Sequence, residues 1–234
     1  MRRLAVFLFA ACASTAGCEL IGEEGSGVLV TRSVDVGAGV RAVEVGDSFV
    51  ATISVGAATP SASVTIDDNL VDHLVIEVDD EVLRVELSGR VRDATLGLEV
   101  ALPALLVLEA SGGSRVQVEG GLDGEIEIGA SGASIVHVDA VELDEFRLDV
   151  SGASRVETGG TAASIEADVS GASELDLAGV EAEVVVVDVS GASTVDVTVE
   201  DQLEANASGA STVRYRGDPD VRVDASGSSS VERA

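Results

Sequence analysis

Acidic residues recur at a fixed place along the second half of the chain. They are Glu109, Asp149, Asp168, Asp188 and Asp224, each two residues before a Ser-Gly pair. Carboxylates that lie close together can bind a divalent cation, because calcium prefers several converging oxygen ligands. A straight row brings few oxygens to one point, and Gly129 and Asn206 interrupt this one. We therefore expect an exposed acidic column that keeps the protein soluble, with no metal or other cofactor.

Serines and histidines are the other residues that could carry chemistry. No serine stands in the Gly-x-Ser-x-Gly turn that presents a hydrolase nucleophile. The chain has two histidines. His137 falls on the polar face of a strand, and His73 stands beside Asp72 near a turn, so we expect solvent around both. Metal sites need clusters of His, Cys or carboxylates at set spacing, and none is present. The sequence predicts a protein that is not an enzyme.

A four-residue sequence, Ser-Gly-Ala-Ser or a close variant, organises these positions. Its copies are 111–114, 131–134, 151–154, 170–173, 190–193, 208–211 and 226–229. Their first serines are 20, 20, 19, 20, 18 and 18 residues apart. A fixed period of this length indicates a stacked repeat.

The residues around each copy predict two strands and a corner. Before Ser151, the apolar Phe146, Leu148 and Val150 alternate with polar residues, and Val156 follows the copy. Alternation of period two puts the apolar side chains on one face of a strand and the acids on the other. Further apolar residues such as Leu143 can supply a third side. We therefore predict an all-β, single-stranded parallel β-solenoid with rungs of 18 to 20 residues, about 34 Å long for seven rungs.

The second serine of each copy has the same parity as the inward valines. These serines are Ser114, Ser134, Ser154, Ser173, Ser193, Ser211 and Ser229. We expect them to point inward as a structural ladder at the corner, hydrogen-bonded to one another or to corner backbone, because a buried hydroxyl needs a partner. The glycine supplies the backbone angles of the bend.

Composition agrees with this fold and excludes some partners. The net charge is −28, from 42 acidic residues and 14 arginines. Such a charge argues against binding nucleic acid. Hydrophobic residues make up 46% and aromatic residues only 2%. These values indicate a thin core of small β-branched side chains.

The N-terminus has the pattern of an export signal. Arg2 and Arg3 precede an apolar stretch, 4–13, that is too short to cross a bilayer. Thr15-Ala16-Gly17-Cys18 then resembles the bacterial lipobox, which implies lipidation of Cys18; Thr15 departs from the usual leucine. The alternative is an ordinary secretory signal with an incidental cysteine, and Cys12 is a poorer lipidation site because it lies inside the apolar stretch. We expect residues 1–17 to be a signal peptide and 18–27 an acidic, glycine-containing flexible tether.

Residues 28 to about 100 contain strand patterns without the repeat. The segments 43–53, 64–70 and 75–83 resemble, in order and spacing, the start of the putative auto-transporter adhesin head domain, or GIN domain. The Ser-Gly-Ala-Ser copies resemble the second half of that family, and together the resemblance covers most of residues 26–232. It implies a right-handed β-helix on an exported protein. We expect one solenoid domain over 28–234, with the regular copies from about 104 onward.

The functional expectation is a non-catalytic, lipid-anchored envelope protein with an adhesive or structural role, at the outer membrane or cell surface. Its partners would be the membrane, through the lipid, and a protein or glycan surface, with self-association through the solenoid end left open. The alternative is a β-helix protein that processes or binds polysaccharide, although Phe49, Phe146 and Tyr215 are the only aromatic residues after the signal. Ice binding would need long threonine ladders, and only Thr194 and Thr212 stack.

Overall fold

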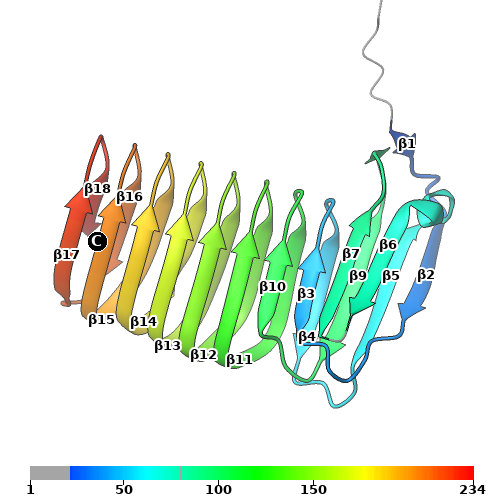
Figure 1. Cartoon of the computed structure of the whole chain (residues 1–234), viewed down its shortest axis with the longest axis horizontal. Helices are drawn as coiled ribbons and strands as arrows, with labels where there is room; N and C mark the ends of the chain where they lie inside the picture. Colours follow the sequence, from blue (N-terminus) through cyan, green and yellow to red (C-terminus); the bar gives the residue numbers. More distant parts are fainter. Residues whose placement is uncertain (1–21, 80) are drawn as a thin grey trace, which may run out of the picture.

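The computed structural model describes residues 22–79 and 81–234. About 67% of the structure is strand and 3% helix. Successive coils stack into a parallel β-solenoid of about six turns, and the tight corners line up along one edge of the column (Figure 1). The predicted fold class is confirmed. Residues 1–21, which include the predicted signal peptide, Cys12 and Cys18, lie outside the described residues.

The regular coils are long strands that bend within each rung. A short strand, β10 (Val107–Ala110), leads into them, and they are β11 (Arg115–Ala130), β12 (Ile135–Val150), β13 (Arg155–Val169), β14 (Glu174–Val189) and β15 (Thr194–Ala207). All neighbours pair in parallel, with Val136 opposite Val116 and Val156 opposite Val136. These offsets equal the sequence period, because one rung places each residue directly over its equivalent in the rung below.

Three runs of inward side chains divide each rung into three sides. In β12 the buried residues are Val136 and Val138, then Val141 and Leu143, and then Phe146, Leu148 and Val150. Exposed Asp139–Ala140 and the pair Asp144–Glu145 mark the bends between the sides. The core is therefore a stack of small aliphatic layers, as the low aromatic content predicted.

Each Ser-Gly-Ala-Ser sequence forms the third corner of its rung. Gly132 and Gly152 have φ of 75° and 77°, a left-handed conformation that favours glycine. The Ala153 amide donates a 2.8 Å hydrogen bond to the Gly132 carbonyl, so the corners also pair with one another. A Cβ on Gly152 would lie 2.5 Å from that carbonyl oxygen. Only glycine fits both the backbone angle and the stacking distance.

The column begins earlier than the regular repeats. β3 (Ala42–Val45) pairs with β10, and β4 (Val50–Val55) pairs with β11, both in parallel. Residues 46–49 form the corner between them, in which Asp47 and Ser48 have φ of 52° and 68°. Fully buried Phe49 takes the place of the second serine. Residues 42–55 are thus a first coil whose connection to β10 is replaced by an insertion.

The insertion, together with the segment before β3, caps this end of the solenoid with two antiparallel extensions. β7 (Val82–Leu87) pairs with β3, and β6 (Leu74–Asp79) forms an antiparallel hairpin with β7. On the other side β9 (Leu96–Leu102) pairs with β4, followed by antiparallel β5 (Ser61–Asp67) and β2 (Leu29–Val34). The 3-10 helix η1 (Asp68–His73) connects β5 to β6, and its Leu70 is fully buried. The cap therefore closes the core at its N-terminal end.

The prediction of a flexible tether over residues 18–27 is wrong for residues 22–27, the part that the structure describes. β1 (Glu23–Glu24) pairs in parallel with β8 (Val91–Arg92). The Gly27 amide donates to the Asp67 carboxylate at 2.6 Å. Residues 22–27 therefore belong to the cap. Their composition resembles a linker, but their partners lie more than 25 residues away in the sequence, which composition cannot reveal.

The last rung of the structure is covered on one side only. It consists of β16 (Thr212–Arg216), β17 (Asp220–Ala225) and β18 (Ser230–Arg233). β17 pairs with β15, and β18 pairs with β16. In the described structure, the inward positions Val221 and Val223 are 38% and 48% exposed.

Candidate interaction surface

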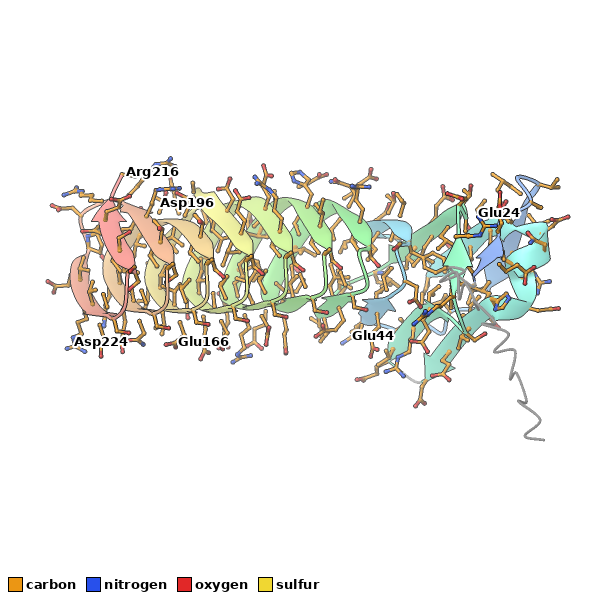
Figure 2. All side chains as sticks on the ribbon, turned by 90° about the horizontal axis from the view of Figure 1, so that it is seen from above. Glu24, Glu44, Glu166, Asp196, Arg216 and Asp224 are labelled. Atoms are coloured by element: carbon orange, nitrogen blue, oxygen red, sulfur yellow. The ribbon has the colours of Figure 1, made fainter. Side chains whose placement is uncertain are left out.

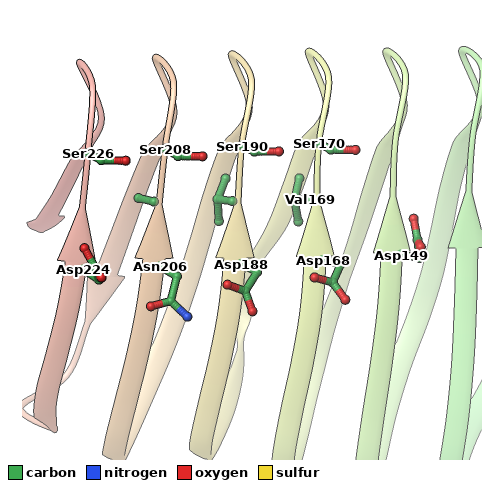
Figure 3. A pocket seen from close by; sticks show the side chains of 12 residues that line it. Asp149, Asp168, Val169, Ser170, Asp188, Ser190, Asn206, Ser208, Asp224 and Ser226 are labelled. Carbon is green, nitrogen blue, oxygen red and sulfur yellow. The ribbon is translucent and has the colours of Figure 1, made fainter.

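The predicted acidic column is a continuous register of the sheet. Glu109 stands opposite Gly129, which stands opposite Asp149; Asp168, Asp188, Asn206 and Asp224 follow in adjacent rungs. The alternation of each strand turns all of them outward. Figure 3 shows these side chains, from Asp149 to Asp224, projecting along one side of the column beneath the corner loops (Figure 3).

The column extends one residue further than the sequence indicated. Glu44 in β3 stands opposite Glu109, and Arg84 in β7 stands opposite Glu44. Arg84 Nε donates to Glu44 Oε2 at 2.6 Å, so this end of the column is neutralised. Glu44 has the same alternation before the Gly46 corner, but no Ser-Gly-Ala-Ser sequence marks that corner. The sequence signal was therefore present only as the Val-Glu-Val alternation.

Burial and repulsion act together on two of the acids. Desolvation raises the pKa of Glu109, and the nearby Glu127, Asp149 and Glu44 raise it further. Glu109 bends over Gly129, where a Cβ would meet its carboxylate. Desolvation also raises the pKa of Asp168, helped by Asp188 and Asp149. Because a raised carboxyl pKa disfavours the charged form in the folded state, these two groups cost stability once the pH rises above their unfolded values.

A shallow groove runs beside the acids on the same face. It has a volume of about 500 Å³ and is lined by Asp149, Asp168, Asp188, Asn206 and Asp224 together with Ser170, Ser190, Ser208 and Ser226. The serines in this groove are the first serines of their corners, and their side chains point outward beside the acids (Figure 3). Each rung thus presents one carboxylate or amide and one hydroxyl, repeated along the column.

The second serines of the corners lie on the inside. Ser114, Ser134, Ser154, Ser173, Ser193 and Ser211 are at most 2% exposed, and Ser229 in the last rung is half-buried. The Ser134 hydroxyl donates to the Ser131 carbonyl at 2.8 Å and so closes its own corner. The Ser134 amide in turn donates to the hydroxyl of Ser154 at 3.2 Å. These serines tie corner to corner, and all but Ser229 are buried.

The two histidines have different surroundings. His137 stands in an outward row between Gln117 and Glu157. His73 does not have the purely solvent surroundings expected from the sequence: its Nδ1 lies 2.6 Å from the Ser88 carbonyl and its Nε2 lies 3.1 Å from Glu23 Oε2. The partners of His73 are 15 and 50 residues away, so spacing could not indicate them.

Charged side chains cover the rest of the exterior. Figure 2 shows Asp196 and Arg216 on one long side of the column and Glu44, Glu166 and Asp224 on the other (Figure 2). Arg155 bridges rungs, with Nη1 2.5 Å from Glu174 and Nη2 3.3 Å from Glu157. In the described part of the chain, no three His, Cys, Asp or Glu side chains are grouped to hold a metal ion. No helix within 22–79 and 81–234 is long and apolar enough to span a membrane.

Solved structures share this fold at low sequence identity. A putative adhesin from Bacteroides fragilis aligns with a TM-score of 0.83 at 18% identity, covering 91% of this chain and 100% of its own. A putative adhesin from Parabacteroides merdae aligns at 0.70 and 22% identity, covering 90% and 98%. A putative lipid binding protein from Parabacteroides distasonis aligns at 0.74 and 20% identity, with the same coverage. The curated proteins contain no match.

A family description matches the sequence itself over most of its length. The match spans residues 40–219, from the first coil through the cap insertion to the last rungs. It therefore includes the strand segments of the earlier resemblance that lie before residue 100 and all the Ser-Gly-Ala-Ser copies except the last, 226–229. The chain belongs to the family described as "putative auto-transporter adhesin, head GIN domain".

Proposed function

We propose that this protein is a lipid-anchored, non-catalytic component of the bacterial cell envelope that uses its solenoid as an adhesive or structural surface. Membership of an adhesin-type family supports this proposal, as does the fold shared with proteins named as adhesins. The outer membrane or the cell surface is the proposed location.

The observation that carries the proposal is the repetition of the exterior. Each rung presents equivalent side chains at equivalent positions, as the carboxylate and hydroxyl rows of the groove illustrate. A repeated surface suits contact with an extended partner through many weak, equivalent interactions. We propose a protein or glycan surface as that partner. Nucleic acid is a poor partner, because the net charge of −28 repels phosphate.

A second copy of the chain is a further proposed partner, at the last rung. Val221 and Val223 expose core positions there, and the unpaired edges of β17 and β18 offer free backbone groups. Contact between two such ends would cover both.

The proposed anchor is Cys18. Only residues 19–21 separate it from Gly22, which lies next to β8 in the cap. An extended chain spans at most about 3.6 Å per residue, so the lipid would lie within roughly 15 Å of the cap. The cap would then face the membrane, and the last rung would lie furthest from it.

Fatty-acid labelling tests the anchor. Cells that express the full chain are grown with an alkyne fatty acid, and the purified protein is assayed for label. We expect label on the natural chain and on Cys12→Ser but none on Cys18→Ser. An unlabelled natural chain, or a labelled Cys18→Ser chain, contradicts the anchor.

A further inference from the structure

The N-terminal segment, residues 22–28, is held on the cap by polar contacts. Besides the β1–β8 pairing, the Ser26 amide donates to Asn69 Oδ1 at 2.9 Å, and the Ser26 hydroxyl donates to Asp68 Oδ1 at 2.5 Å. Gly27 donates to Asp67, and the Asp68 amide donates to the Val28 carbonyl at 2.8 Å. The segment buries no large apolar side chain, so these polar contacts hold it in place.

Glu23, in this segment, contacts two residues of η1, Asn69 and His73. Asn69 Nδ2 donates to Glu23 Oε1 at 3.0 Å and to the Glu24 carbonyl at 2.9 Å. The other carboxylate oxygen of Glu23 faces His73 Nε2 at 3.1 Å. Loss of the His73 contact therefore weakens the position of Glu23 directly.

His73 faces a hydrogen-bond acceptor at each ring nitrogen. On one side is the Ser88 carbonyl, 2.6 Å from Nδ1, and on the other is the Glu23 carboxylate. Neither acceptor carries a hydrogen. A neutral imidazole has one N–H and an imidazolium has two. Both contacts can be hydrogen bonds only when His73 is charged.

The backbone of His73 stays in place whichever form the ring takes. The Ser88 amide and hydroxyl both donate to the His73 carbonyl, at 2.7 and 3.0 Å. Loss of the ring proton therefore weakens the contact of His73 with Glu23 and its segment. The hydrogen bonds from Ser88 to the His73 carbonyl, which join η1 to the end of β7, remain.

We propose that residues 22–27 form a proton-operated latch on the cap, closed while His73 is an imidazolium and loosened when His73 loses its proton.

The charged groups around the ring set the pH range. Hydrogen bonds to Ser88 and then to Glu23 raise the pKa of His73, and the charges of Glu23 and Asp72 raise it further. The hydrogen bond from His73, followed by that from Asn69, lowers the pKa of Glu23. On β8, Arg92 is engaged by Glu24 at 2.6 Å, and Arg90 precedes that strand.

The raised pKa of His73 and the lowered pKa of Glu23 define a pH range in which the latch is closed. The histidine contribution is fully present below the ordinary histidine pKa and is lost as the pH rises through the raised pKa of His73. The Glu23 contribution is present above the ordinary glutamate pKa and is lost as the pH falls through its lowered pKa. The latch therefore opens on the alkaline side through His73 and on the acid side through Glu23.

Opening of the latch would increase the distance that the chain can span between the anchor and the solenoid. This consequence, unlike the latch, rests on the proposed anchor at Cys18. With residues 22–27 released, the first residue held on the cap changes from Gly22 to Val28, and the maximum span from Cys18 to that residue grows from roughly 15 Å to roughly 35 Å. The solenoid would then stand further from the membrane.

Hydrogen exchange tests the latch in the full chain carrying Cys18→Ser, so the result does not depend on the anchor. The amides to follow are those of Glu23, Gly25, Ser26 and Gly27, all donors in the closed latch. After correction for the intrinsic rate, we expect their protection to fall between pH 6 and 9, by about tenfold for each unit by which the pKa of His73 is raised. Protection in β12–β14 should stay constant.

Two histidine variants sharpen the test. The glutamine of His73→Gln is uncharged and has a single donor group, so it cannot donate to both acceptors as an imidazolium does. We therefore expect weak protection of residues 22–27 at pH 6 and no change in that protection up to pH 9. The matched control is His137→Gln, which should retain the natural pH response. Unchanged protection of residues 22–27 between pH 6 and 9 in the natural chain overturns the proposal. So does a pH response that persists in His73→Gln while β12–β14 remain protected.

Discussion

Gly152 shows how much structure one residue of this repeat determines. Its φ of 77° suits glycine, and its Cα faces the carbonyl of Gly132 so closely that a Cβ would lie 2.5 Å away. Gly124 has nearly the same φ, 78°, but nothing lies within 4 Å of a Cβ built there. A comparison of alanine substitutions at the two glycines therefore separates the free-energy cost of the backbone angle from the cost of disrupting corner stacking.

Gly152→Ala should destabilise the solenoid much more than Gly124→Ala. A left-handed alanine costs about 1 to 2 kcal/mol, which is the full expectation for Gly124→Ala. At Gly152 the methyl group also pushes two corners apart and breaks the Ala153 to Gly132 hydrogen bond, which adds at least about 1 to 3 kcal/mol. Urea denaturation of both variants measures the difference. Equal midpoints would show that corner stacking contributes nothing.

At the scale of elements, the cap depends on the end of β5. Asp67 is 1% exposed, and its two carboxylate oxygens accept hydrogen bonds from Gly27 at 2.6 Å and Thr95 at 2.7 Å. It thereby joins β5 to the N-terminal segment and to the start of β9. The next residue, Asp68, is exposed and accepts from Ser26.

Asp67→Asn should loosen the cap, and Asp68→Asn should not. An asparagine at 67 directs an NH₂ group at a backbone N–H, which leaves a buried donor unsatisfied at a cost of about 1 to 3 kcal/mol. At 68 the amide oxygen can still accept from Ser26, so the change should stay within about 0.5 kcal/mol. Thermal unfolding compares the two variants. A larger effect at 68 than at 67 would contradict this role of Asp67.

The regular elements could be predicted because each is specified by nearby residues. Around Ser151, the alternation from Phe146 to Val156 and one Ser-Gly-Ala-Ser sequence define two sides and the corner between them. The cap could not be predicted to the same depth. The corner at 46–49 contains Asp47 and Ser48 in place of glycine and alanine, and β1 pairs with a strand 68 residues further along the chain. Such partners are set by tertiary contacts, which a local pattern does not contain.

At the scale of the whole molecule, the described fold is a cap followed by a regular column of stacked rungs. The outward acidic row could be predicted from the sequence because stacked rungs place residues that are one repeat apart next to one another. Its extension to Glu44 and Arg84, and the bending of Glu109 over Gly129, depend on how the insertion folds back onto the first coil. The same folding brings Glu23 to His73, so the latch was not visible in the sequence.

A direct binding measurement tests whether this column binds a surface. The full chain carrying Cys18→Ser, so that no lipid contributes, is labelled and added to intact bacterial and animal cells and to immobilised envelope glycans and proteins. We expect saturable binding to at least one of these surfaces, displaced by excess unlabelled chain. Binding that rises linearly with concentration on every surface, with no displacement, would contradict it.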